Sequence, residues 1–254
     1  MKHHTPPEFH EQTVFVELIG AGATGSKILA GLVQLHHAML ELGHPRGLHV
    51  RCWDFDMVSH SNLGRQLFTE SDLGCNKAVS LISRYNYHYS LEWTAEPQRF
   101  TAIPMGYPGS AILISAVDSR KSRSEINQHL HKYPKPYLID CGCGRDYAQC
   151  AIGNGSPELP YPWQLYPDWI DPAKDGKLRS SCSMEDALNR QGLFTNQWIA
   201  TAVLEFIWQL FRFGGLDYSE LYINLQTGRM TSRPIMIPPR KKVAGNRKKR
   251  KAVS

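Results

Sequence analysis

Six residues between positions 54 and 77 carry side chains that could hold a nucleotide. Asp54 follows an apolar run, and an acid in that place commonly hydrogen-bonds a ribose hydroxyl. Arg65 and Lys77 bring two cations near it, and departure of pyrophosphate from an α-phosphate develops negative charge that such cations stabilise. Taken singly, each cation has plain surface charge as its alternative explanation. The full set is Asp54, Asp56, Asn62, Arg65, Gln66 and Lys77.

A glycine-rich turn precedes this stretch. The letters "GAGATG" place Gly20, Gly22 and Gly25 between an apolar run and a helical pattern. Such a turn lets the backbone approach a phosphate, and the helix that follows supplies N–H groups and positive potential. The same turn also serves simple strand–helix packing. With Asp54 it permits a nicotinamide or flavin site, whereas the two cations that follow suit a triphosphate.

Asp118 is a third acidic candidate, because it directly follows another apolar run. Open α/β sheets bind ligands at the carboxyl ends of their strands, and a carboxylate there can hold Mg²⁺ that bridges phosphates. The alternative is a helix N-cap, because "DSRKSRSEI" would suit one.

The elements that must position these side chains alternate between strands and helices. Short apolar runs rich in β-branched or aromatic residues predict strands at 13–20, 49–55, 110–117 and 135–142. Helical spacing of apolar residues predicts helices at 24–42, 72–87 and 119–131. This alternation predicts an α/β, Rossmann-like fold with a mainly parallel sheet and helices on both faces.

The second half of the chain has a different pattern. Residues 154–182 hold five prolines and show no periodicity, so we expect a long crossover loop over about 154–194. A strand at 148–153, a helix at 195–213 and a hairpin turning at "QTGR" predict a C-terminal antiparallel extension. The aromatic helix at 195–213 is apolar nearly all round, which favours a core or dimer element.

Composition and charge exclude several classes of protein. The 254 residues are 42% hydrophobic and 20% charged, as in an ordinary globular protein. No apolar run reaches eighteen residues and the N-terminus has no apolar signal region, so we expect no membrane span and a cytoplasmic location. Residues 238–254 hold eight Lys or Arg and no acid. This tail is predicted to be disordered, and it would either contact nucleic acid or act as a solubilising tail.

Taken in order, the motifs resemble those of the ThiF/MoeB/ubiquitin-activating (E1-like) superfamily, whose members adenylate the C-terminal glycine of ubiquitin-like proteins. The matching stretches are "GAGATG" (20–25), "DFDMVSHSNLGRQLF" (54–68), "LGCNKA" (73–78) and "SAVDSRKSR" (115–123). The second half is similar to the ThiF-like proteins of the PRTRC cassette, which occurs on bacterial plasmids and other mobile elements.

The resemblance implies a role for each candidate residue, with ATP and Mg²⁺ as cofactors. Asp54 would bind the ribose, Asn62, Arg65 and Lys77 the phosphates, and Asp118 the Mg²⁺. Gln66 would support the site, and Asp56 and the three glycines complete the nucleotide-binding set. The resemblance also implies a ubiquitin-like partner with a C-terminal glycine and a homodimer. The expected domain plan is an N-terminal segment (1–12), an adenylating domain (13–237) and the basic tail (238–254).

The cysteines depart from the superfamily pattern. Many members hold structural zinc with two C-x-x-C pairs, which this chain lacks, so we expect no structural zinc. Some relatives use a crossover-loop cysteine to form a thioester or to carry sulfur. Cys182 is the only cysteine in the irregular segment, and it has either that nucleophilic role or a packing role.

Two other functions stay open at this point. An NAD(P)-dependent oxidoreductase would explain the glycine turn and Asp54 but not Arg65, Lys77 and Asp118. A plasmid-associated nucleic-acid-binding protein would rely on the basic tail.

Overall fold

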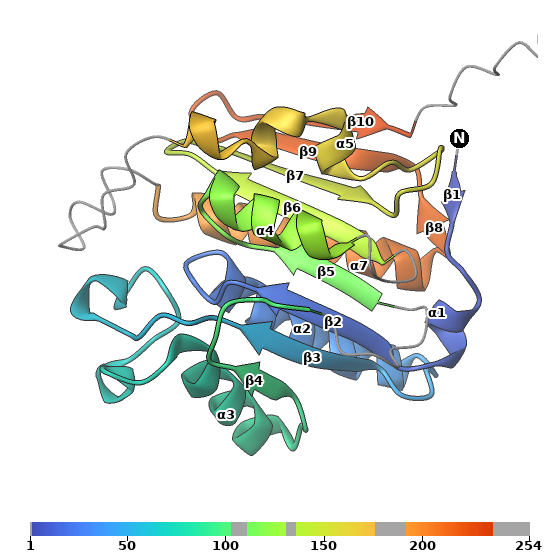
Figure 1. Ribbon diagram of the computed structural model, residues 1–254. Helices are drawn as coiled ribbons and strands as arrows, with labels where there is room; N and C mark the ends of the chain where they lie inside the picture. Colours follow the sequence, from blue (N-terminus) through green and yellow to red (C-terminus); the bar gives the residue numbers. More distant parts are fainter. Residues whose placement is uncertain (1, 103–110, 131–135, 176–191, 236–254) are drawn as a thin grey trace, which may run out of the picture.

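The chain folds around one eight-stranded mixed sheet with the strand order β10-β9-β7-β6-β5-β2-β3-β4 (Figure 1). This is a computed structural model, and it describes residues 2–102, 111–130, 136–175 and 192–235. Five neighbouring strands are parallel, β6, β5, β2, β3 and β4, and β7, β9 and β10 continue the sheet as antiparallel strands. The bounds are β2 Val14–Ile19, β3 Leu48–Trp53, β4 Thr94–Glu96, β5 Ala111–Ser115, β6 Tyr137–Cys143, β7 Tyr147–Gly153, β9 Tyr218–Asn224 and β10 Arg229–Pro234. The predicted fold class is therefore confirmed, including the C-terminal antiparallel extension.

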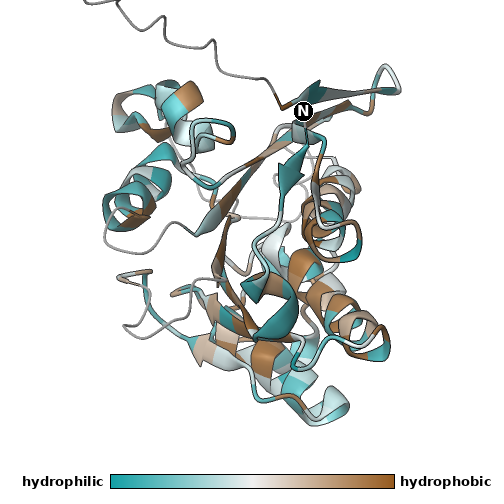
Figure 2. Cartoon of the chain, turned by 90° about the vertical axis from the view of Figure 1, so that its right-hand side faces the viewer, coloured by the Kyte–Doolittle hydropathy of each residue, from teal (hydrophilic) through white to brown (hydrophobic). Residues whose placement is uncertain are grey.

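Helices cover both faces of this sheet (Figure 2). On one face, α2 (Gly25–Glu41), α3 (Lys77–Tyr89) and α7 (Thr195–Arg212) pack on the larger apolar core. On the other face, α4 (Arg120–Leu130) and α5 (Pro162–Leu165) pack on a smaller one. Figure 2 shows the hydrophobic residues gathered in the sheet and on the helix sides that face it. The near-continuous apolar runs of the parallel strands follow from this burial on two faces.

Helices α2 and α7 pack against each other at Gly31. A Cβ atom built at Gly31 would lie 2.0 Å from a methyl carbon of Leu204, so a larger residue there would require the Leu204 side chain to move. The aromatic helix predicted from the sequence is thus a core element, with Phe206 fully buried. The helix is not buried all round, because Trp198 is 49% exposed.

The predicted helix at 72–87 begins five residues late. Residues Glu70–Asp72 form a 3-10 turn (η2), and Gly74, with a φ of 76°, interrupts the helical conformation before α3. Asn76 then starts α3 by accepting a hydrogen bond from the Val79 N–H at 3.1 Å. Composition favours helix throughout this stretch, but the N-cap residue decides where the helix begins.

The proline-rich crossover is more regular than the sequence predicts. Three short helices, α5, η3 (Pro167–Ile170) and η4 (Pro172–Lys174), follow one another along it. Each begins at a proline, where the missing N–H costs nothing and the fixed φ suits a helix. The hydroxyl of Tyr166 donates to the buried carboxylate of Glu220 at 2.8 Å, which fastens this segment to β9.

The N-terminal residues pack on the same body. Strand β1 (His3–His4) pairs with β8 (Gly215–Leu216), and α1 (Glu8–Glu11) buries Phe9 in the larger core. Another 3-10 turn, η1, spans His60–Asn62. Within the described residues, no helix has the length and apolar character that a membrane span requires. The basic tail lies outside the described residues, and its suggested role and the domain plan stay predictions.

Candidate functional site

The site lies where the strand order of the parallel sheet reverses direction, between β2 and β5. Open α/β sheets bind ligands in the crevice outside the carboxyl ends of the strands at this point. A cavity of about 1060 Å³ opens there, slightly larger than the range of roughly 300–1,000 Å³ typical of small-molecule sites. Its lining comes from the segments that follow β2 to β6, from the starts of β7 and α7, and from Trp169 and Asp175 in the crossover.

The three glycines of the turn after β2 do different jobs. Gly20 has a φ of 98°, and a Cβ atom there would lie 2.7 Å from the Ala116 carbonyl oxygen. A Cβ atom at Gly25 would lie 1.8 Å from the Gly20 carbonyl oxygen. Strand–helix packing therefore explains these two. It does not explain Gly22, which lines the cavity and whose Cβ would meet no atom within 4 Å. The open space at Gly22 is where a phosphate could approach the backbone.

Asp54 joins the glycine turn to the end of β3. Its carboxylate accepts hydrogen bonds from the N–H groups of Ala21 at 2.6 Å and Asp56 at 2.8 Å. Burial raises the pKa of Asp54, and these two N–H groups and nearby Lys77 act in the opposite direction. A carboxylate has about four acceptor positions, so Asp54 can bind a ribose hydroxyl while it also holds the turn in shape.

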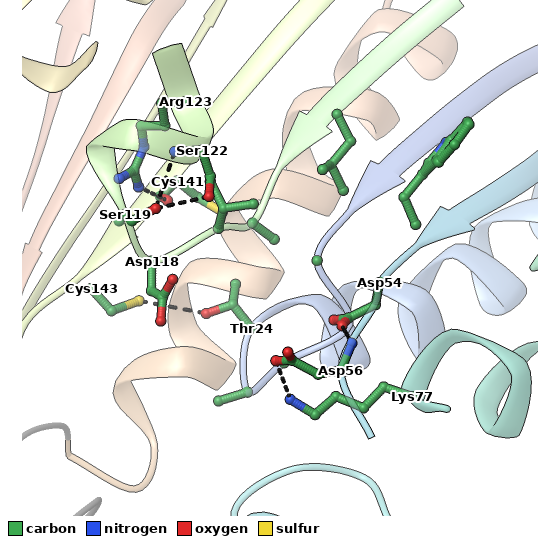
Figure 3. A pocket seen from close by; sticks show the side chains of 18 of the residues that line it. Thr24, Asp54, Asp56, Lys77, Asp118, Ser119, Ser122, Arg123, Cys141 and Cys143 are labelled. Atoms are coloured by element: carbon green, nitrogen blue, oxygen red, sulfur yellow. Dashed lines mark hydrogen bonds and ion pairs between the residues drawn. The ribbon is translucent and has the colours of Figure 1, made fainter. Parts of the chain in front are cut away.

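Lys77 begins α3 and reaches back toward the same edge of the sheet. Its ammonium group forms an ion pair with Asp56 at 3.0 Å, and its side chain is largely buried. The amide of Asn76 donates to the Asp54 and Asp56 carbonyl oxygens at 2.8 and 3.2 Å, which fixes α3 against this loop. Asp56 thus positions Lys77 in the structure, in addition to lining the cavity itself. Figure 3 shows Asp54, Asp56 and Lys77 together.

Asn62, Arg65 and Gln66 all line the cavity. The Asn62 side-chain oxygen accepts from the N–H and the hydroxyl of Ser59 at 2.9 and 3.1 Å, which closes the η1 turn. Gln66 is only 6% exposed, and its side-chain oxygen has no hydrogen-bond partner among the described residues. Burial lowers the pKa of Arg65, and the negative charge of the Asp118 carboxylate acts in the opposite direction.

Asp118 is exposed at the cavity and does not cap α4. Ser119 accepts from the N–H of Ser122 at 3.1 Å, and the carboxylate of Asp175 accepts from the N–H groups of Arg120 and Lys121 at 2.8 and 3.0 Å. The N-cap alternative for Asp118 is therefore wrong, because the side chains of Ser119 and Asp175 cap α4 instead. Figure 3 shows Asp118 between the Asp54–Lys77 group and the Arg123–Cys141 group.

The sequence assigns no role to several residues of the cavity. Arg123 and Asp140 form a buried ion pair at 2.8 Å, and Arg123 also donates to the Cys141 carbonyl oxygen at 2.9 Å. Thr24 donates to the side-chain oxygen of Asn196 at 2.8 Å. Each link joins segments far apart in the chain, so only the folded structure reveals it.

Of the described cysteines, three are buried in the core, Cys143 is partly buried and Cys75 is exposed. Cys52, Cys141 and Cys150 are the three buried in the core. Cys143 lines the cavity beside Thr24, and burial raises the pKa of its thiol to about 11. Cys182 lies outside the described residues. Within those residues, no group of three or more His, Cys, Asp or Glu could hold a metal ion.

The fold is that of an α/β protein with a cavity at the switch point of the parallel part of its sheet. The model of the ThiF family matches residues 11–189, well over half of the chain, and the chain belongs to the ThiF family. Membership of this family supports adenylyltransferase chemistry. No protein of the curated collection matches the chain.

A solved structure supports the fold independently. The crystal structure of PaaA in its selenomethionine form is similar to this chain with a TM-score of 0.59 and 16% sequence identity. The similarity covers 90% of this chain and 75% of the PaaA chain. At this identity the likeness bears on the fold alone.

Proposed function

We propose that the protein is an ATP- and Mg²⁺-dependent adenylyltransferase that activates the C-terminal carboxylate of a ubiquitin-like protein. One observation carries the proposal. Asp54, Arg65, Lys77 and Asp118 come from separate segments of the chain, and all four line one cavity beside the open face of Gly22. Two acids and two cations around an open glycine turn suit a nucleoside triphosphate better than a dinucleotide.

Each side chain has a part in holding ATP. Asp54 would accept hydrogen bonds from the ribose, as an acid at this position of the fold does. The glycine turn with Asn62, Arg65 and Lys77 would hold the phosphates, and Gln66 would support them. Asp118 is an exposed carboxylate that could hold Mg²⁺, which would neutralise negative charge on the phosphates.

The reaction needs positioning and charge neutralisation more than acid–base catalysis. A carboxylate oxygen of the partner forms a bond to the α-phosphorus of ATP, and the bond from that phosphorus to the bridging oxygen breaks. Pyrophosphate leaves with the bonding electrons, and an acyl-adenylate remains. Because the attacking carboxylate is already ionised at neutral pH, no general base is required. Arg65 and Lys77 would stabilise the charge that develops on pyrophosphate.

The finer assignments are proposals that follow from the sequence resemblance. The partner would end in glycine, and thioester transfer to Cys182 is an optional second step. The chain would act as a homodimer in the cytoplasm, within a PRTRC-type system. Contact of the basic tail with nucleic acid would add to the enzyme rather than replace it.

The test is ATP–pyrophosphate exchange by the purified protein with its cognate ubiquitin-like partner. We expect exchange in the wild type and its loss in Arg65→Ala. Arg229→Ala is a matched control, because Arg229 is exposed on β10 and does not line the cavity. Exchange that survives Arg65→Ala undiminished would refute the assignment.

A further inference from the structure

The cavity continues past Asp118, away from the residues assigned to the nucleotide. In the sheet, β6 and β7 lie on the side of β5 opposite to β2 and β3. Gly142 and Cys143 at the end of β6, and Tyr147 and Gln149 in β7, line this part of the cavity. Figure 3 shows Cys143 on the far side of Asp118 from Asp54. ATP held by Asp54 and the glycine turn leaves this side for a second reactant.

Asn196 is the polar side chain that stands out in this second part. It lines the cavity, and it is only 2% exposed. Its side-chain oxygen accepts from the Thr24 hydroxyl at 2.8 Å, but its amide nitrogen has no hydrogen-bond partner among the described residues. Buried polar groups almost always have a partner, so an unpaired buried amide beside a cavity points to a ligand.

The position of Asn196 favours an acceptor with negative charge. Asn196 is the second residue of α7, an 18-residue helix with no acidic residue in its first turn. The N-terminus of a long helix carries positive potential. The helix end is fixed at the cavity, because the Thr195 hydroxyl donates to the Arg145 carbonyl oxygen at 3.0 Å in the β6–β7 connection.

The other charges nearby leave this role to Asn196. The buried cation of this part, Arg123, is already paired with Asp140. The carboxylates of Asp118 and Asp140 also line the cavity and would repel an incoming anion. A neutral donor at a positive helix end can hold a carboxylate close to Asp118 without adding a further cation beside Arg123.

We propose that Asn196 binds the acyl substrate, with its amide N–H donating to a carboxylate oxygen while the other oxygen attacks the α-phosphorus. Thr24 orients the amide by holding its oxygen, and so links the glycine turn to the acyl group. This inference rests on the proposed adenylation, because it assigns the second reactant of that reaction.

Two probes separate the acyl contact from nucleotide binding without the natural partner. One is 5′-O-[N-(acetylglycyl)sulfamoyl]adenosine, which carries an acyl group at the position that it occupies in the acyl-adenylate. The other is 5′-O-sulfamoyladenosine, which lacks the acyl group. Asn196→Ala should weaken binding of the acylated probe about tenfold in calorimetry, as expected for one lost hydrogen bond to a polarised oxygen. The affinity for the unacylated probe should stay the same.

Asn196→Asp and Gln197→Asp form a matched pair. Both add a negative charge at the start of α7, but Gln197 is exposed and absent from the cavity lining. Asn196→Asp should lose the acylated probe selectively, and Gln197→Asp should bind both probes as the wild type does. If Asn196→Ala does not fold, Asn196→Asp carries the test, because it is isosteric and keeps an acceptor for Thr24.

The outcomes are distinguishable. A selective loss of the acylated probe supports the inference. Unchanged binding of both probes, or an equal loss of both, overturns it and leaves the proposed function standing. A wild type that binds neither probe overturns the proposed function and the inference together.

Discussion

Replacing Gly22 with alanine should separate folding from nucleotide binding. A Cβ atom at Gly22 meets no atom within 4 Å, and the φ of Gly22 is not positive. Alanine therefore fits the native backbone and should leave the free energy of unfolding unchanged or raise it by up to about 1 kcal/mol, because it restricts the unfolded chain. The new methyl group would, however, fill the space through which a phosphate approaches the turn.

The expected loss of ATP affinity can be estimated from the cost of inserting a methyl group into space that the bound phosphate would fill. Inserting a methyl group into a filled space costs about 1–3 kcal/mol, which corresponds to roughly 5- to 150-fold in the dissociation constant for ATP with Mg²⁺. Isothermal titration calorimetry measures this constant, and urea unfolding gives the stability of the same variant.

Gly25→Ala is the contrasting variant. Its methyl would lie 1.8 Å from the Gly20 carbonyl oxygen, so the backbone must shift and the protein should lose on the order of 3 kcal/mol of stability or more. The reasoning is refuted if Gly22→Ala folds normally and still binds ATP with wild-type affinity. The same holds if Gly25→Ala proves as stable as the wild type.

Three further predictions concern stability and are measured by urea unfolding. Arg123→Ala leaves the buried carboxylate of Asp140 unpaired and should lower the free energy of unfolding by about 3–5 kcal/mol. The double variant Arg123→Met with Asp140→Leu should recover most of this loss. Asp175→Ala removes the carboxylate that caps α4 and should cost about 1 kcal/mol, whereas an unchanged stability would contradict that cap. Burial lowers the pKa of His44, and its ring nitrogens hold the Phe9 carbonyl oxygen and the Gly47 N–H. The native state thus binds fewer protons than the unfolded state, so stability should fall as the pH drops below about 6.5, and His44→Ala should flatten that slope.

The architecture was predictable because the chain is locally consistent. Each parallel strand is buried on both faces, so it appears in the sequence as a short apolar run. An acidic residue directly follows two of these runs. Because the carboxyl ends of parallel strands meet at one edge, the sequence predicts that Asp54 and Asp118 lie near each other. The structure brings both to one cavity with Arg65 and Lys77.

What the sequence could not predict depends on contacts between distant segments. Asp175 caps α4 from 55 residues away, and Thr24 holds Asn196 from 172 residues away. Neither link leaves a local pattern. The lack of periodicity in the proline-rich stretch predicts a long crossover loop, yet Pro162 and the two prolines that follow at five-residue steps each begin a helical turn. Proline favours the first position of a helix and opposes later ones, and only position within the fold decides between the two.

The most direct test of the central claim is the Mg²⁺ dependence of nucleotide binding. Calorimetric titration of the wild type with ATP, with and without Mg²⁺, and with NAD and NADP compares a triphosphate site with a dinucleotide site. We expect ATP to bind more tightly with Mg²⁺ than without it, and more tightly than either dinucleotide. In Asp118→Ala the affinity for ATP should no longer depend on Mg²⁺. Tight binding of NAD or NADP that is indifferent to Mg²⁺ and to Asp118→Ala would contradict the central claim.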